Sequence, residues 1–210
     1  MGVANKTIEN SKILIVEGKD EAGFIAALIR HLGLSLPQIV QIDGKDKFKR
    51  DFMPFWYSGD NSNVNSLGVV MDAEKNQAAS THKSICSVFE KLGIPKPSSP
   101  GVLVTTEKIK VGTFIMPDNE SAGMLESLCL ASITSDPVID CLNKYFDCFM
   151  TMRSAEEVVK INMPKSRLLA YLATKSPYAN SIDIAAQKGH FNFENEVFNP
   201  LKSFIIDLLS

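Results

Sequence analysis

The N-terminal half of the chain alternates short apolar runs with segments whose apolar positions have helical spacing. The first apolar run ends at Glu17-Gly18, which is typical of a buried strand that stops in a tight turn. The helical spacing that follows ends at Gly33, a common helix stop. Strand and helix segments alternate at 12–16 and 22–32, at 39–42 and 48–56, and at 67–71 and 78–92. This alternation predicts right-handed crossovers and a mostly parallel sheet.

The pattern changes after this alternation. The proline-rich segment 94–101 is predicted to be a connector, because proline fits neither a helix interior nor a central strand. Two strand candidates, 102–105 and 111–116, lie on either side of Glu107-Lys108 and predict an antiparallel hairpin at a sheet edge. Further helices are predicted near 124–129, 137–149, 164–172, 182–188 and 200–209. We therefore expect an α/β core over residues 10–132, with a helical C-terminal part, 133–210, packed on it.

Composition limits the classes of function. The chain has 210 residues, a net charge of −2 and a pI near 5.9, so it has no global basic field for nucleic acid or an anionic membrane. Nucleic acid would have to be bound through a local basic patch or a bridging metal ion. No signal peptide or membrane-length apolar run is present, so a cytoplasmic protein is expected. The cysteines lack metal-site spacing and are expected to be buried or half-buried free thiols.

Acidic residues follow two of the predicted strands. Glu17 and Asp72 each come at a strand end, and adjacent parallel strands lie only about 4.8 Å apart. Glu21 follows Glu17 by four residues, so both carboxylates could converge, and Glu74 would share a side with Asp72 if the chain stays extended. Converging carboxylates attract a hard cation such as Mg²⁺. The alternative is that Glu17 only neutralises the dipole of the following helix.

Other polar residues have two interpretations each. Asp118 is a site acid or a turn former beside its proline, and Glu126 is a site acid or a first-turn helix acid. A basic run at the start of the second helix is a solvated face or a contact for phosphates; it comprises Lys45, Lys47, Lys49 and Arg50. The histidines, which are His31, His82 and His190, lie far apart and are expected at the surface or at helix ends. Nucleotide-binding and nucleophile-elbow motifs are missing.

The segment Val16-Glu17-Gly18-Lys19-Asp20-Glu21, together with Asp72-Ala73-Glu74, resembles the TOPRIM domain of topoisomerases, DnaG-type primases, ribosomal-RNA maturases and OLD-family nucleases. The resemblance implies a TOPRIM-like three-layer core and a Mg²⁺ or Mn²⁺ site with Glu17 and Asp72 as ligands. Glu74 stands where the family has a second aspartate, and it keeps the carboxylate on a longer side chain.

Two later segments, 114–130 and 164–204, resemble bacterial TOPRIM-like proteins related to the OLD nucleases. That resemblance implies that Glu21 and Glu126 join the metal site and that Lys165 lies near the reacting phosphate. The function expected is a divalent-metal-dependent phosphodiester hydrolase acting on nucleic acid. Its expected catalytic residues are Glu17 and Lys165, and its expected metal ligands are Glu17, Glu21, Asp72, Glu74 and Glu126. Its expected phosphate contacts are Lys19, Lys45, Lys47, Lys49 and Arg50.

The sequence also allows two alternatives to a hydrolase. The first is a catalytically silent TOPRIM-like module that binds nucleic acid or a protein partner, such as a separately encoded ATPase. The second is a nucleotidyltransferase or primase-like activity, which would need a nucleotide pocket that the sequence does not reveal.

Overall fold

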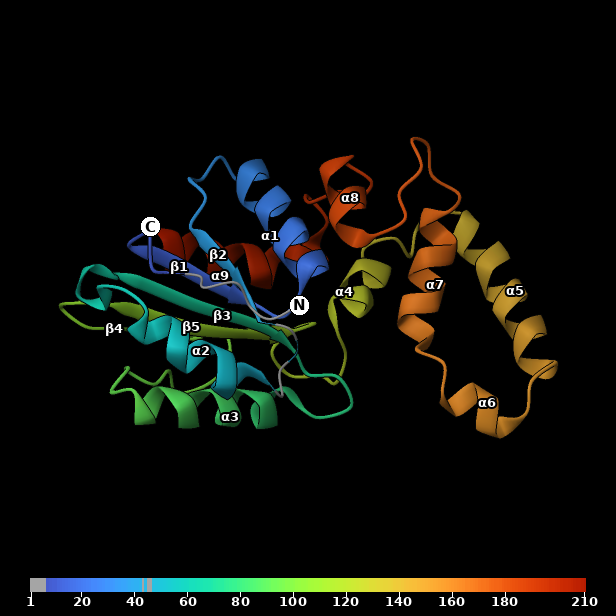
Figure 1. The fold of residues 1–210 in the computed structure, drawn as a ribbon. Helices are drawn as coiled ribbons and strands as arrows, with labels where there is room; N and C mark the ends of the chain where they lie inside the picture. The colour runs from blue at the N-terminus through green and yellow to red at the C-terminus, as the bar shows by residue number, and fades with distance from the viewer. Residues whose placement is uncertain (1–6, 43, 45–46) are drawn as a thin grey trace.

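A five-stranded sheet forms the centre of the computed structural model, which describes residues 7–42, 44 and 47–210 (Figure 1). The strands are β1 (Lys12–Val16), β2 (Gln38–Gln41), β3 (Ser66–Asp72), β4 (Leu103–Thr105) and β5 (Lys110–Met116). Their order across the sheet is β2-β1-β3-β5-β4. All neighbouring pairs are parallel except β4 and β5, which run antiparallel. The predicted mostly parallel sheet with an antiparallel edge hairpin is therefore confirmed.

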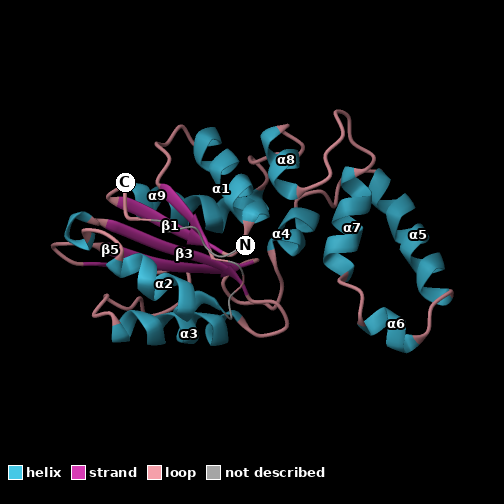
Figure 2. Ribbon diagram, viewed as in Figure 1, coloured by secondary structure: helices cyan, strands magenta, loops and turns pink. Residues whose placement is uncertain are grey.

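Helices cover both faces of this sheet, which confirms a three-layer α/β fold (Figures 1 and 2). The helices are α1 (Lys19–His31), α2 (Phe48–Tyr57), α3 (Ala78–Lys91), α4 (Leu125–Ala131), α5 (Val138–Thr151), α6 (Ala155–Val159), α7 (Met163–Leu172), α8 (Ile182–Gln187) and α9 (Asn199–Leu209), with short 3₁₀ turns η2 (Asn61–Asn63) and η3 (Glu196–Phe198). Helices α2 and α3 lie on one face, and α1, α8 and α9 lie on the other. Helices α5, α6 and α7 project beyond α4, away from the sheet.

The central strands are apolar along their whole length because both of their faces are covered. Every residue of β3 is buried, and Leu14 and Val70 pack into one core while Ile13 and Val69 pack into the other. Two large apolar clusters thus hold the sheet between its helical layers.

The C-terminal helix completes the core on the α1 face. Phe204 and Leu208 of α9 belong to the same buried cluster as the β1 and β3 side chains. Gly68 of β3 and Gly112 of β5 face each other in register, and a Cβ at either position would lie within 2.7 Å of Leu208 or Phe204 atoms. Glycine at these positions therefore lets α9 approach the sheet closely. The domain boundary predicted after residue 132 stays a prediction, and this core includes residues from both sides of it.

A similar close approach joins α1 to α8. A Cβ at Gly23, in the middle of α1, would lie 2.2 Å from the Cβ and 2.9 Å from the Cα of Asp183. Gly23→Ala is therefore expected to destabilise the protein by about 2 kcal/mol, because backbone has to move to make room. At a helical site with open space around it, the same change would stabilise the protein by roughly 1 kcal/mol. The sign of the shift in the denaturation midpoint therefore shows whether Gly23 is closely packed or open. An unchanged or raised midpoint would contradict the close packing of α1 on α8.

No helix of the described part of the chain combines the length and the apolar composition needed to cross a membrane. The cytoplasmic location stays a prediction.

Candidate functional site

The ends of β1 and β3 lie side by side and bring two acids together. Glu17 follows the last residue of β1, and Asp72 is the last residue of β3. The backbone N–H of Asp72 is 3.4 Å from Glu17 Oε2. The backbone N–H of Leu125, the first residue of α4, donates to Asp72 Oδ1 at 3.0 Å. Asp72 thus satisfies an amide at the start of α4, which places that helix at the same edge of the sheet.

Two more carboxylates reach this edge from the first turns of helices. Glu21 lies in the first turn of α1 and Glu126 in the first turn of α4, where its side chain is buried. The Glu21 carboxylate lies against the turn after β1, since a Cβ on Gly18 would be 3.0 Å from its Oε2 atom. Glu17, Glu21, Asp72 and Glu126 line one cleft of about 490 Å³, which we call the carboxylate cleft.

The carboxylates of this cleft influence one another's ionisation. Burial raises the pKa of Glu21 to about 7, and the negative charges of Glu17, Glu126 and Asp20 add to the rise. Burial also raises the pKa of Asp72 well above its usual range, with further increases from the charges of Glu21, Glu17 and Glu126. The hydrogen bond from Leu125 opposes this shift only in part. The cleft therefore concentrates negative charge that a proton or a cation would stabilise.

The acidic side chains of the cleft offer carboxylate oxygens, and oxygen atoms are the ligands that a hard divalent cation prefers. Within the residues that the structure describes, however, no three His, Cys, Asp or Glu side chains are arranged so that they could already hold a metal ion. The carboxylates surround a shared space without meeting at one point. Binding an ion there would require side-chain movement, which is open to the half-buried Glu17 and Glu21.

Glu74 lies at the rim of the same cleft but does not extend β3. Its φ angle is 56°, in the left-handed region, and its N–H donates to the carbonyl of Gly123 at 2.7 Å. The expectation that extended geometry aligns Glu74 with Asp72 is therefore wrong. Glu74 is exposed, whereas Asp72 is only 8% exposed.

The family model described as "Protein of unknown function (DUF3226)" matches residues 11–210. The chain belongs to this DUF3226 family. A comparison with curated proteins gave no match.

Among solved structures, the DUF3226 chain is similar to the C-terminal region of the Xanthomonas campestris pv. campestris OLD protein, with 12% identity and a TM-score of 0.49. That match covers 95% of this chain and 96% of the other. The chain is also similar to the C-terminal region of the Burkholderia pseudomallei OLD protein, with 13% identity and a TM-score of 0.48, over 97% of this chain and 100% of the other.

Two lysines of the DUF3226 chain lie at the carboxylate cleft. The ammonium group of Lys19 is 3.3 Å from Asp183 Oδ2, and its side chain is 75% exposed. Lys165 is exposed in the first turn of α7, where its backbone N–H donates to the side chain of Asn162 at 3.1 Å. The edge of the cleft thus carries positive charge beside its acidic floor.

The basic run at the start of α2 lies elsewhere. Lys49 lines a different hollow, between α2 and α3, and Arg50 forms an ion pair with Asp51 at 2.6 Å. Lys47 is exposed just before α2, and Lys45 lies outside the described residues. A phosphate contact through this run stays a prediction.

Sequence reasoning did not identify the residues that attach the C-terminal segment to the cleft. Asp20 Oδ1 accepts hydrogen bonds from the backbone N–H groups of Ile182 and Asp183 at 3.1 and 3.3 Å, at the start of α8. Asp183 then pairs with Lys19, and Asn162 lines the cleft beside Lys165. The contacts of Asp20 and Lys19 with the start of α8 join positions far apart in the chain, so no local pattern could reveal them.

The remaining polar candidates have structural roles. Asp118 Oδ1 accepts from the backbone N–H groups of Glu120 and Ser121 at 3.0 and 2.7 Å, so the turn-former interpretation is supported. His31, in the last turn of α1, pairs with Glu194, and His190 follows α8. The expectation for His82 is wrong, since it is buried inside α3 with Nδ1 2.8 Å from Thr113 Oγ1, where burial lowers its pKa.

The cysteines only partly match their prediction. All are free thiols; Cys129 is buried and Cys86 is half-buried. The prediction is wrong for Cys141 and Cys148, which are exposed because α5 leaves much of its surface to solvent.

Proposed function

We propose that this protein is a divalent-metal-dependent phosphodiester hydrolase acting on nucleic acid. The observation that carries the proposal is the cleft in which Glu17, Glu21, Asp72 and Glu126 surround one space while lysines lie at its edge. Carboxylates that hold a divalent ion, with cationic side chains that contact phosphates, are a recurring arrangement in phosphoryl-transfer sites.

Within the cleft, the acidic residues would hold Mg²⁺ or Mn²⁺, with Glu74 available from the rim. When bound, such an ion would activate water and neutralise charge that develops on the phosphate. Asp72 is fixed by the amide of Leu125, and Glu17 is oriented toward the amide of Asp72. These two side chains are the proposed principal ligands, because a backbone amide holds Asp72 in place and Glu17 lies beside it.

The lysines would bind the substrate's phosphates. Lys165 projects from the first turn of α7, and Lys19 is held at the cleft by the buried Asp183. A local pair of ammonium groups can recruit a polyanion even though the net charge of the chain is −2. Lys165 is the candidate for the group nearest the reacting phosphate.

We further propose that the α/β core is a TOPRIM-like domain. Glutamate at the end of β1 and aspartate at the end of the adjacent parallel β3 agree with the arrangement that the sequence resemblance implies. We also propose that the chain has a protein partner, such as a separately encoded ATPase.

The function is tested by incubating the purified chain with plasmid DNA, single-stranded DNA and RNA. Cleavage is expected with Mg²⁺ or Mn²⁺ and is expected to stop when a chelator removes the ion. Glu17→Gln should lower the cleavage rate by roughly a hundredfold, whereas Glu107→Gln, on the exposed β4–β5 hairpin, should not change it. Cleavage that is unaffected by the chelator or by Glu17→Gln would reject the proposal.

A catalytically silent binding module is the second candidate. It is favoured by the finding that no three acidic, His or Cys side chains of the described residues already form a metal-holding group. Titration with Mn²⁺ separates the two functions. The module predicts no binding up to about 1 mM Mn²⁺, while the hydrolase predicts binding that Glu17→Gln weakens.

A further inference from the structure

Helix α8 of the C-terminal part lies beside α1, although the two helices are far apart in the chain (Figure 1). A Cβ on Gly23 would lie 2.2 Å from the Cβ of Asp183, so the two helices are in direct contact there. Lys19 precedes Gly23 by four residues and therefore lies on the same side of α1. The side chain of Asp183 thus reaches Lys19, which lines the carboxylate cleft.

The backbone at the start of α8 is held by Asp20, the second residue of α1. A single oxygen of Asp20, Oδ1, accepts hydrogen bonds from the N–H groups of Ile182 and Asp183 at 3.1 and 3.3 Å. N–H groups in the first turn of a helix have no partner within that helix, so the carboxylate satisfies donors that α8 itself cannot. Asp20 lines the cleft with the other acids, but this oxygen serves the α8 backbone.

The carboxylate of Asp183 has a partner for each oxygen. Oδ1 accepts from the hydroxyl of Ser181, and Oδ2 lies 3.3 Å from the ammonium nitrogen of Lys19. Asp183 is only 5% exposed, and removing the partner of a buried charge is costly, so the ammonium group is held at the carboxylate. An ammonium group has three N–H donors, and the contact with Asp183 therefore leaves donors for a phosphate.

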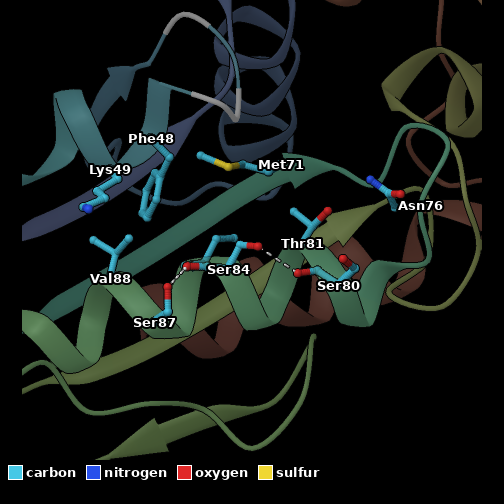
Figure 3. Close-up of a pocket in the computed structure, with 10 residues that line it drawn as sticks. Phe48, Lys49, Met71, Asn76, Ser80, Thr81, Ser84, Ser87 and Val88 are labelled. Carbon is cyan, nitrogen blue, oxygen red and sulfur yellow. Dashed lines mark hydrogen bonds between the residues drawn. The ribbon is translucent and has the colours of Figure 1, made fainter.

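The lysine of the second hollow has different neighbours. Lys49 lines the hollow between α2 and α3 together with hydroxyl groups, an amide and apolar side chains (Figure 3). No acidic residue is among the described residues that line that hollow, so none of them holds Lys49 as Asp183 holds Lys19. Ordering a long side chain costs entropy, and a lysine that is already held loses less when a ligand binds. Lys19 is therefore the better prepared phosphate contact.

We propose that Asp20 and Asp183 are positioning residues for phosphate binding at the carboxylate cleft. Asp20 sets the place of α8 against α1, and Asp183 then holds the ammonium group of Lys19 where it meets a phosphate of the substrate. Neither acid is a metal ligand in this assignment. The role rests on the proposed function for its ligand, a nucleic acid, but not on hydrolysis.

A double-mutant cycle between Asp183 and Lys19 tests the first link. The affinity for a labelled single-stranded oligonucleotide is measured by fluorescence anisotropy with Ca²⁺, and KM and kcat are measured with Mn²⁺. Lys19→Gln, at an exposed position, and Asp183→Asn are each expected to weaken binding and raise KM about tenfold. The double variant should lose no more than either single variant, because Asp183 has nothing to hold once Lys19 is replaced. The value of kcat and the Mn²⁺ affinity should stay within about twofold of wild type.

Two substitutions of Asp20 test the second link. Asp20→Asn and Asp20→Ala both remove the charge, but only asparagine keeps an oxygen that can accept from the α8 backbone. Asp20→Ala should weaken oligonucleotide binding about fivefold, whereas Asp20→Asn should bind the oligonucleotide and Mn²⁺ as wild type does. Lys83→Gln, which removes an exposed lysine from α3 on the other face of the sheet, is the control and should change nothing.

The outcomes separate this role from the proposed hydrolysis. A wild-type protein that binds the oligonucleotide without cleaving it would reject the hydrolase, while the affinities of the variants would still decide the role of the two acids. Additive losses in Asp183→Asn and Lys19→Gln would show that Asp183 does not act through Lys19, which overturns the proposal. Weaker Mn²⁺ binding by Asp20→Asn would make Asp20 a metal ligand and overturn it too. No binding of the oligonucleotide by wild type up to about 1 mM would also overturn it.

Discussion

Replacing Asp72 by Asn is expected to lower metal-dependent cleavage of nucleic acid by roughly a hundredfold or more. The change removes the charge of a side chain that contacts the space shared by Glu17, Glu21 and Glu126. The amide oxygen of Asn can still accept the hydrogen bond from Leu125 that Asp72 Oδ1 now accepts at 3.0 Å, so the start of α4 is kept. The loss should therefore appear in the cleavage rate and in Mn²⁺ affinity rather than in folding.

Asp118→Asn is the matched control for this experiment. Asp118 also accepts backbone hydrogen bonds through one carboxylate oxygen, from Glu120 and Ser121, but it does not line the cleft. Its variant should cleave at the wild-type rate. The readouts are the initial rate with Mn²⁺ and the rise in melting temperature that Mn²⁺ produces. An Asp72→Asn protein that cleaves within about twofold of wild type would remove Asp72 from the proposed site.

The strand ends were predictable because they depend on local pattern. Unbroken apolar runs mark β1 and β3 as central parallel strands, and the acid after each run must then lie at the carboxyl edge of the sheet. Glu17 and Asp72 follow from this rule alone. Glu21 follows from helical spacing. For Glu126 the residues alone leave two interpretations, a site acid or a first-turn helix acid, and only the family resemblance favours the first, because nothing local places α4 at that edge.

The prediction failed where local and long-range structure diverge. An extended chain would align Glu74 with Asp72, but the N–H of Glu74 donates to the carbonyl of Gly123 and the Glu74 backbone is left-handed, so β3 ends at Asp72. The sequence predicts His82 at the surface or at a helix end, yet its side chain lies on the buried face of α3 and contacts Thr113 of β5. Both outcomes depend on partners distant in sequence.

The position of the C-terminal helices shows the same limit. Their amphipathic pattern predicts that α8 and α9 exist, but not which surface they cover. That choice follows from Gly23, Gly68 and Gly112, which leave room for Asp183, Leu208 and Phe204. A glycine in a helix or strand pattern indicates close approach without naming the partner.

Replacing Glu21 by Gln is expected to stabilise the metal-free protein above neutral pH by about 2 kcal/mol. Burial, with the charges of Glu17, Glu126 and Asp20, raises the pKa of Glu21 from 4.5 to about 7 in the folded protein. Below pH 4.5 the group is protonated in both states and has no effect on stability. Between pH 4.5 and 7 the unfolded chain releases this proton first, so the free energy of unfolding falls as pH rises, and above 7 the full cost is present.

The measurement is urea denaturation of both proteins in chelator across pH 4 to 8.5. Wild type should lose stability between about pH 4.5 and 7, and Glu21→Gln should lose less, since glutamine cannot ionise. At pH 8, Mn²⁺ should make wild type the more stable of the two proteins, because a cation stabilises the ionised carboxylates of wild type more than those of the variant. Glu9→Gln, at an exposed position before β1, is the control and should follow wild type. Identical pH profiles for wild type and Glu21→Gln would show that the Glu21 carboxylate is not held among like charges, which is the physical basis of the proposed site.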